Sequence, residues 1–529
     1  MTARTLARAG LIVTAAFFLS RVLGWVRLVV ITNLFGATTE LDAYFAAFRV
    51  PDMLFQLVAA GALSSALIPV LAGLWQRGEE ARAWRVVSSV LNVMLLALAG
   101  LALVVAVFAH QIVPLVTPGF DLVTTELAVR LTRIMLLSPV LLALGSVASS
   151  VLNARGRFGA AATAPLFYNG AVIGAAIFAA PFLGVDALAI GVVIGSLLHL
   201  LVQLPALAGE RFQLSFNIDL RDPEARQALL LMAPRAIGLG AGQITFTVNT
   251  MLATGIGVGA VTAYTVAFTM LQIPLGIIAM PLGVVIFPAL ARAAAAGSVR
   301  EFGTLVVRSM RLLLYVMLFF SVVGIVLRRQ AVALLFDFGF DERALDLTAN
   351  TLSFMLIGLC GHALVVVLAR SFYAGQDTRT PVITAVLEVT VSVTVALATV
   401  GTLGLSGLGL GLATGAWFEA VLLTFLLWRR TPGVGLGSVV RPIPLFLLGA
   451  VLAGAVALLI ARGSEHVFGT DQGKIAQLIV LGAAGSAAAL TYAVYSWLVR
   501  IPELSQTLAL VRSLGRRGGG VETPPGPAA

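Results

Sequence analysis

The chain has 529 residues, of which 59% are hydrophobic and only 11% charged, and its formal net charge is +10. A soluble domain carries about 25% charged residues, so a chain this apolar could not cover its own surface in water. Its apolar runs of about twenty residues exclude the shorter alternating strands of an outer-membrane barrel, and basic residues that lie mostly in short loops argue against a nucleic-acid-binding stripe.

Uninterrupted apolar runs, separated by turn-forming residues, predict an all-α membrane protein with fourteen transmembrane helices. Arg21 and Arg27 stand where a signal-peptide cleavage site would follow, so the first run is predicted to be a retained helix. The expected spans are 10–36, 41–74, 84–109, 123–152, 160–183, 187–209, 226–252, 260–291, 303–327, 346–373, 381–402, 407–430, 440–462 and 474–500.

The distribution of basic residues predicts the orientation. With a cytoplasmic N-terminus, most basic loop residues fall on the cytoplasmic side, as the positive-inside rule requires. The opposite side then receives only Arg328, Arg329, Arg343, Arg462 and Lys474. We therefore predict a multi-pass protein of the bacterial inner membrane with both termini in the cytoplasm.

An internal repeat appears at a separation of about 220 residues, the length of six spans. Residues 43–48 (AYFAAF) align with 263–268 (AYTVAF), and 68–72 (IPVLA) align with 287–291 (FPALA). An even number of spans gives the two halves the same orientation, a parallel repeat. We predict a six-helix bundle in 1–210, a second in 226–430, two added helices in 440–500 and a disordered cytoplasmic tail in 501–529. Two such bundles favour alternating access around a central cavity, the alternative being a structural bundle without one.

Charged residues inside the spans are the candidate ligand-binding groups, because each costs roughly 2.5–3.5 kcal/mol at a helix centre. Three of these arginines have no acidic residue within one helical turn: Arg21, Arg27 and Arg235. They favour an anionic ligand such as phosphate, because the planar guanidinium group binds phosphate through paired hydrogen bonds. Arg49 either joins them or is neutralised by Asp52 three residues on, and Asp42 is either a cavity residue or an interfacial cap. Glu388 and Glu419 either pair with interface groups or serve the transport path.

Three prolines seven residues apart, Pro274, Pro281 and Pro288, predict a bent helix that lines a cavity and acts in hinge motion or gating. The four histidines and single cysteine show no metal-ligand spacing, and no phosphate-cradling loop precedes a Lys-Ser or Lys-Thr pair. We therefore expect no metal, no cofactor and no enzymatic activity; a coupling cation, the membrane potential or mass action would drive transport.

Several longer motifs resemble the MurJ/MviN family of lipid II flippases, in the multidrug/oligosaccharidyl-lipid/polysaccharide exporter superfamily. They are 20–27 (SRVLGWVR), 34–37 (LFGA), 42–51 (DAYFAAFRVP), 152–158 (LNARGRF), 164–165 with 168–169 (AP, YN) and 372–381 (FYAGQDTRTP). Residues carrying the resemblance outside the expected cavity are Asn153, Arg157, Tyr373, Asp377, Thr378 and Pro381. The similarity extends over the first twelve expected helices.

The resemblance implies a peptidoglycan role in cell-wall synthesis and cell shape: a flippase for undecaprenyl-pyrophosphate-linked disaccharide-pentapeptide. The polar head would cross through the cavity, while the lipid tail stays in a groove bordered by the last two helices. Cavity positions of the family match Arg21, Arg27, Asp42 and, as a basic residue, Arg49.

The chain also departs from the family pattern. Phe55 and Gln56 stand where the family usually has two arginines, Ala60 where it has an acid, and Thr269 where it has another arginine. Arg235 is a candidate to compensate for them. These departures leave two alternatives for the cargo, another polyprenyl-linked glycan or a small cation, although a cation exporter would be expected to carry acids rather than arginines in this cavity. A membrane-embedded glycosyltransferase or a structural scaffold is the alternative outside this superfamily.

Overall fold

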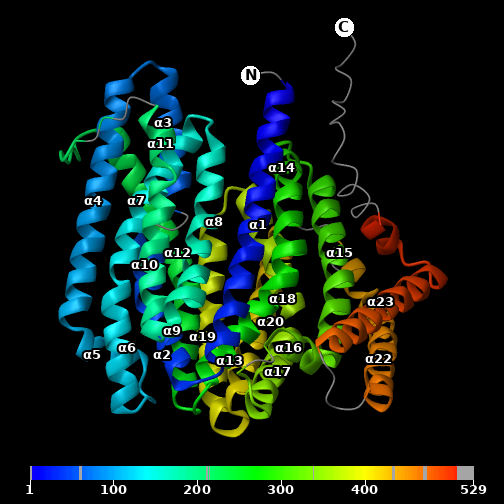
Figure 1. Cartoon of the computed structure of the whole chain (residues 1–529). Coiled ribbons are helices and arrows are strands. Elements are labelled where there is room, and N and C mark those ends of the chain that lie inside the picture. Colours follow the sequence, from blue (N-terminus) through cyan, green and yellow to red (C-terminus); the bar gives the residue numbers. More distant parts are fainter. Residues whose placement is uncertain are drawn as a thin grey trace. The chain divides into compact units, whose positions relative to one another are not determined.

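The computed structural model describes residues 3–58, 62–209, 213, 215–336, 339–431, 435, 437–468 and 474–508, and every regular element in these ranges is helical (Figure 1). The first half comprises α1 (Ala3–Phe35), α2 (Thr39–Val58), α3 (Ala62–Gln76), α4 (Glu80–Val107), α5 (Ala109–Val116), α6 (Leu122–Met135), α7 (Leu137–Ala154), α8 (Phe158–Gly174), α9 (Ala180–Leu183), α10 (Asp186–Leu201), α11 (Leu204–Ala208) and α12 (Pro223–Thr254). The second half comprises α13 (Ala260–Pro274), α14 (Met280–Ala295), α15 (Val299–Val326), α16 (Arg328–Phe336), α17 (Glu342–Ile357), α18 (Leu359–Ala374), α19 (Arg379–Leu403), α20 (Leu405–Arg430), α21 (Gly437–Val440), α22 (Ile443–Phe468) and α23 (Lys474–Leu498).

Eleven helical stretches in the described ranges are long and apolar enough to cross a membrane. The number becomes twelve if α17 and α18, between which the chain bends by 44°, are counted as one span. Large apolar side chains on their outer faces are exposed, as Phe182 at 86% and Leu459 at 71% illustrate. Such apolar faces are suited to contact with lipid, and a helix can be surrounded by lipid because its backbone hydrogen bonds are satisfied internally. The all-helical membrane class is therefore confirmed.

The helix limits differ from the expected ones where local breaks interrupt an apolar run. The expected span 123–152 is divided at Leu136 into α6 and α7, and the expected span 41–74 corresponds to α2 and α3, between which residues 59–61 lie outside the described ranges. At the other end of the chain, residues 502–508 are helical and Glu503 is buried. The described helical structure thus extends past residue 500, where a disordered tail was expected to begin.

The first of two compact units contains residues 1–269, 335–351 and 385–411. Within it α1 packs along α8, α2 lies against α6 and α12, and α10 lies against α7 and α8. Figure 1 shows α4, α7, α10 and α12 with their axes roughly aligned, as in a helical bundle.

The segment before α12 is held against the start of α4 by polar contacts. The Asn92 amide donates to the carbonyl oxygens of Ser215 and Asn217, at 2.8 and 3.1 Å. Arg82 Nε pairs with Asp222 Oδ2 at 2.8 Å, and Asp222 also caps α12 by accepting from the Glu224 N–H. These contacts fix where α12 begins.

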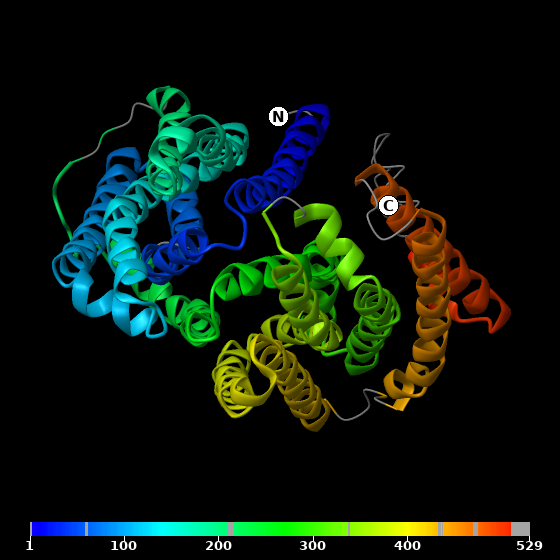
Figure 2. The same ribbon diagram turned by 60° about the horizontal axis from the view of Figure 1, so that its bottom comes forward.

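The second unit contains residues 270–334, 352–384 and 412–529. Within it α15 packs against α18 and α22, and α22 packs along α23, the orange and red helices of Figure 2. Tyr315 of α15 stacks on Tyr492 of α23 with ring centroids 4.7 Å apart, and its hydroxyl lies 2.8 Å from the Ser496 hydroxyl. The last two helices are therefore attached to α15 by buried aromatic and polar contacts.

Candidate functional site

Arg27 lies in the part of α1 that faces α8. Its guanidinium carbon is 5.6 Å from the centroid of the Tyr168 ring, a distance at which the cation is attracted to the aromatic face. The side chain is half-buried, and its charge also acts on Asp52 and on Tyr44 of α2. Arg27 thus belongs to a polar cluster shared by α1, α2 and α8.

Arg49 of α2 carries the second charge of this cluster. Its guanidinium carbon is only 3.7 Å from the centroid of the Phe246 ring in α12, and its buried Nε has no hydrogen-bond partner. Asp52, three residues on, acts electrostatically on the same guanidinium, so the local neutralisation considered from the sequence accounts for part of its surroundings. The contact between Arg49 and the Phe246 ring is the part of these surroundings that the sequence did not indicate.

The ring of Phe246 is itself fixed by aromatic neighbours on α13. Its centroid is 5.3 Å from that of Tyr264 and 4.7 Å from that of Phe268, both nearly edge-to-face. The Asn249 amide donates to the Tyr264 hydroxyl at 2.8 Å. Arg49 is therefore held against a rigid aromatic wall, which orients its remaining donors.

Asp42 lies near the start of α2 and is 1% exposed. Its Oδ2 accepts from the Gly259 N–H at 2.7 Å, and its Oδ1 accepts from the N–H and the hydroxyl of Thr262 at 2.8 and 2.6 Å. The carboxylate therefore caps the start of α13 from a different helix. The first N–H groups of a helix have no acceptor within the helix, so they favour a negative charge there.

At the same end of the first unit, two glycines are in close backbone contact. Gly36 and Gly339 both have positive φ, and a Cβ on Gly36 would lie 2.3 Å from the Gly339 carbonyl oxygen. Nearby, the Ala37 N–H donates to the Gly339 carbonyl and the Asn33 amide donates to the Leu335 carbonyl at 2.8 Å. Only glycine allows such a close approach, so this end is tightly packed.

The other expected cavity residues are distributed as follows. Arg21 lies on α1 with an exposed side chain, and the side chain of Arg235 on α12 lies outside the described residues. Phe55 and Gln56 are half-buried on α2, and Ala60 lies outside the described residues. The Thr269 hydroxyl donates to the Thr265 carbonyl at 2.8 Å, a bond within its own helix.

The two intramembrane glutamates have different surroundings. Glu419 of α20 is 8% exposed and accepts a hydrogen bond from the Thr384 hydroxyl at 3.2 Å. Glu388 of α19 is half-buried and acts electrostatically on Tyr264.

The expected hinge prolines surround an irregular turn. Pro274 ends α13, a π-helical turn follows at Leu275–Ala279, and Pro281 stands in the first turn of α14, which also contains Pro288. A proline lacks the N–H that an α-helix needs, and a π-turn is one way for the backbone to accommodate this. The three prolines thus lie in one long helical stretch with a local break.

The family-motif residues lie at two helix-connecting turns. Asn153 accepts from the Gly156 N–H in the turn after α7, and the Arg157 side chain donates to the Ala206 carbonyl at 3.3 Å. In the turn before α19, Asp377 accepts from the N–H groups of Arg379 and Thr380 and pairs with Arg430. Burial opposes ionisation of the Asp377 carboxyl, but hydrogen bonds from the Thr380 hydroxyl and N–H, together with the hydrogen bond and charge of Arg430, lower its pKa to about 2.

Tyr373, Thr378 and Pro381 flank that aspartate. The Tyr373 and Thr378 side chains are exposed, whereas Pro381 is buried in the first turn of α19. A proline is well tolerated in a first helical turn. The second motif therefore builds a helix cap, and the geometry brings it together with the end of α20.

Comparison with known proteins gives the family. The family described as Lipid II flippase MurJ matches residues 31–472. A relative from Burkholderia cenocepacia, named Lipid II flippase MurJ, is 34% identical over 433 residues, which cover 80% of this chain and 84% of the relative. A relative from Rhizobium tropici, named Probable lipid II flippase MurJ, is 27% identical and is matched over 91% of this chain and 92% of its own length.

Solved structures agree on the fold. A structure described as Lipid II flippase MurJ, inward closed conformation, aligns with a TM-score of 0.76 at 22% identity over 92% of this chain and 98% of that chain. A multidrug transporter of the MATE family and MOP superfamily, in an inward-facing conformation, aligns with a TM-score of 0.66 at 17% identity over 78% of this chain and 95% of that chain. The family match and the Burkholderia relative establish that this chain belongs to the MurJ family of lipid II flippases.

Proposed function

We propose that this chain is a flippase that carries lipid II, undecaprenyl-pyrophosphate disaccharide-pentapeptide, from the inner to the outer leaflet of the bacterial inner membrane. The observation that carries the proposal is the pair Arg27 and Arg49, two cations held inside the helical bundle of a chain of this family. Guanidinium groups bind phosphate through paired hydrogen bonds. A charged side chain within a membrane-spanning bundle is costly, and such residues usually serve a function such as ligand binding.

The proposed pyrophosphate ligands are Arg21, Arg27, Arg49 and Arg235. Because Phe55 and Thr269 replace arginines that the family usually has, Arg235 on α12 is proposed to supply a missing charge. Asp42 is proposed to act on the transport cycle through its bonds to α13, which would hold one end of the pathway closed.

The proposed mechanism is alternating access by two six-helix bundles, 1–210 and 226–430, within fourteen spans. Two hydrogen bonds support a pseudo-two-fold relation: the N–H and the hydroxyl of Thr262 both donate to Asp42, and Thr262 lies 220 positions later, as its repeat equivalent. Residues related by a two-fold axis can bond each other directly only near the axis.

The proposed hinge is the π-helical turn with the three prolines around it, Pro274, Pro281 and Pro288. The groove for the lipid tail is proposed to be bordered by α22 and α23, within 440–500.

Transport is tested in a bacterium depleted of its own lipid II flippase and supplied with this chain. We expect growth to be restored and lipid II to become accessible to a membrane-impermeant labelling reagent added outside. A strain without the added chain is the control. If the protein reaches the membrane but lipid II stays inside, the cargo assignment is wrong, and assay of other polyprenyl-linked glycans then tests the alternative cargo.

The proposed orientation places both termini and the basic loops in the cytoplasm. Reporter enzymes fused after Ser298 or Arg430 are expected to be active only inside the cell, and those fused after Gly119 or Ser464 only outside, because basic loops are retained on the inner side. Activity readings of a paired cytoplasmic and extracytoplasmic reporter check this. External activity after Ser298 would contradict the proposed number of spans.

A further inference from the structure

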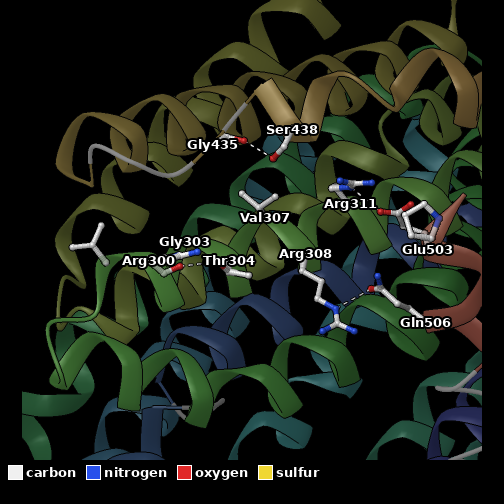
Figure 3. Close-up of a pocket in the computed structure, with 12 residues that line it drawn as sticks. Arg300, Gly303, Thr304, Val307, Arg308, Arg311, Gly435, Ser438, Glu503 and Gln506 are labelled. Atoms are coloured by element: carbon white, nitrogen blue, oxygen red, sulfur yellow. Dashed lines mark hydrogen bonds and ion pairs between the residues drawn. The ribbon is translucent and has the colours of Figure 1, made fainter.

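The second unit contains a cavity of about 550 Å³ that is separate in sequence from the Arg27 and Arg49 cluster (Figure 3). The start of α15, the start of α21 with Gly435 before it, and the helical segment 502–508 form its walls. Its volume lies within the range of about 300–1,000 Å³ that is usual for small-ligand sites.

Three arginines and one glutamate give the cavity an excess of positive charge. Arg300, Arg308 and Arg311 come from one helix, whereas Glu503 comes from the segment after α23. Arg311 Nε is 2.7 Å from Glu503 Oε1, and Arg308 Nε donates to Gln506 Oε1 at 3.1 Å. Figure 3 shows both arginine side chains beside Glu503 and Gln506.

Arg308 uses one guanidinium nitrogen for its hydrogen bond, whereas Arg311 and Glu503 form an ion pair in which the buried Arg311 Nε has no hydrogen-bond partner. Within the described part of the chain, the terminal nitrogens of Arg308 and Arg311 donate to no protein group. The Glu503 side chain is 3% exposed, and its Oε2 is buried without a hydrogen-bond partner. The acid therefore orients Arg311 and neutralises one charge, which leaves the other two for a ligand.

The cavity lies where membrane-spanning helices end. The candidate spans Val299–Val326 and Gly437–Ser464 begin at its walls, and the span Lys474–Leu498 ends four residues before Pro502. Arg311 stands eleven residues after Arg300, about 16 Å further along the helix axis. A headgroup layer is about 5–8 Å thick, so a stretch of this length at the end of a membrane-spanning helix is long enough to cross it.

The rim of the cavity also offers apolar surface and free helix donors. Val299 is 46% exposed and lines the cavity, and Val440 of the adjoining α21 is 62% exposed. The N-cap Ser298 makes no side-chain hydrogen bond to the first turn of α15, and although the Val299 N–H donates to the Gly297 carbonyl, the positive end of this helix adds to the attraction for an anion. A ligand with one anionic and one apolar part fits this combination.

We propose that this cavity binds the phosphate-bearing headgroup of a membrane lipid. The placement of the cavity in the cytoplasmic leaflet rests on the proposed orientation of the chain. Basic pockets between membrane helices recognise such headgroups through arginine. Two lipid sources share the chemistry, an anionic bilayer phospholipid and the polyprenyl pyrophosphate of the transported substrate, and the experiment separates them.

The test uses the full chain in detergent and measures retained lipid by native mass spectrometry. Phosphatidylglycerol, undecaprenyl pyrophosphate and phosphatidylcholine are added in separate arms, with inorganic phosphate as a soluble competitor. We expect one of the two anionic lipids to be retained over phosphatidylcholine, and Arg308→Gln to lower its affinity about tenfold, the effect of losing one charge-assisted hydrogen bond. Arg292→Gln, an exposed arginine of α14 outside the cavity, is the matched control and should retain lipid normally.

Arg311→Gln alone would leave Glu503 buried without its partner, so the double variant Arg311→Gln/Glu503→Gln is the second probe and is also expected to lose lipid. Equal retention of all three lipids, unchanged retention in Arg308→Gln, or full displacement by inorganic phosphate would overturn the proposal. Lipid retention requires no transport, so loss of flippase activity with normal retention would count against the proposed function alone. External reporter activity after Ser298 would move the site to the other leaflet.

Discussion

Replacement of Arg27 by alanine is expected to lower lipid II transport about a hundredfold or more while the protein remains inserted. A bidentate arginine–phosphate contact contributes about 3 kcal/mol, and each 1.4 kcal/mol is a factor of ten. Its half-buried position against the Tyr168 ring leaves donors for a ligand, so the loss falls on binding more than on packing. Outside labelling of lipid II in a depleted strain measures the effect, and membrane immunoblots check insertion.

Two further variants separate charge from shape. Tyr168→Phe keeps the aromatic face under Arg27 and should retain most transport, whereas Arg21→Ala should abolish it if that exposed arginine also contacts the pyrophosphate. Arg130→Ala is the matched control, because this exposed arginine forms a surface ion pair with Asp186. Full transport by both Arg21→Ala and Arg27→Ala would remove these residues from the site.

Replacement of Asp42 by alanine is expected to abolish transport by releasing the start of α13. The change leaves two N–H groups and the Thr262 hydroxyl without their acceptor in a buried place, at a cost of about 3 kcal/mol or more. A cysteine at Ala43, which is 0% exposed, reports the opening in a background where Cys360 is alanine. We expect an impermeant thiol reagent to label it only after Asp42 is replaced.

Glu40→Ala is the matched control for this variant, because Glu40 is an exposed acid in the same first turn of α2. Thr262→Ala removes only the hydroxyl bond and should give intermediate labelling. Equal protection of Ala43→Cys with Asp42 present and absent would show that the carboxylate does not hold this end closed.

Much of this protein was predictable from its sequence because the bilayer makes local composition decisive. A helix that satisfies its own hydrogen bonds and exposes apolar side chains can be recognised from one run of about twenty residues, whatever its neighbours. The all-helical class and most helix limits followed in this way, and motifs such as 42–51 and 372–381 led to the family.

Local breaks were less predictable, because they depend on packing as well as on composition. The division of 122–154 at Leu136 was not expected, although Pro139 in the first turn of α7 lacks the N–H that would bond the Met135 carbonyl, because Pro165 inside α8 causes no such division. By contrast, Pro274 indicated an irregular turn, although not that the turn would be π-helical over Leu275–Ala279. A missing N–H indicates that the helix must adjust but leaves its geometry open.

Only the tertiary structure decided the partners of the buried charges. The bonds of Asp42 to Gly259 and Thr262, the stacking of Arg49 on Phe246, and the cavity that joins Arg308 and Arg311 to 502–506 each connect residues nearly two hundred positions or more apart. Helical periodicity describes which residues share a face of one helix, whereas the groups opposite that face depend on how the helices pack. An aspartate inside an expected membrane span, such as Asp42, indicates that its carboxylate needs a hydrogen-bond donor. The packing of α2 against the start of α13 determined which groups donate to it.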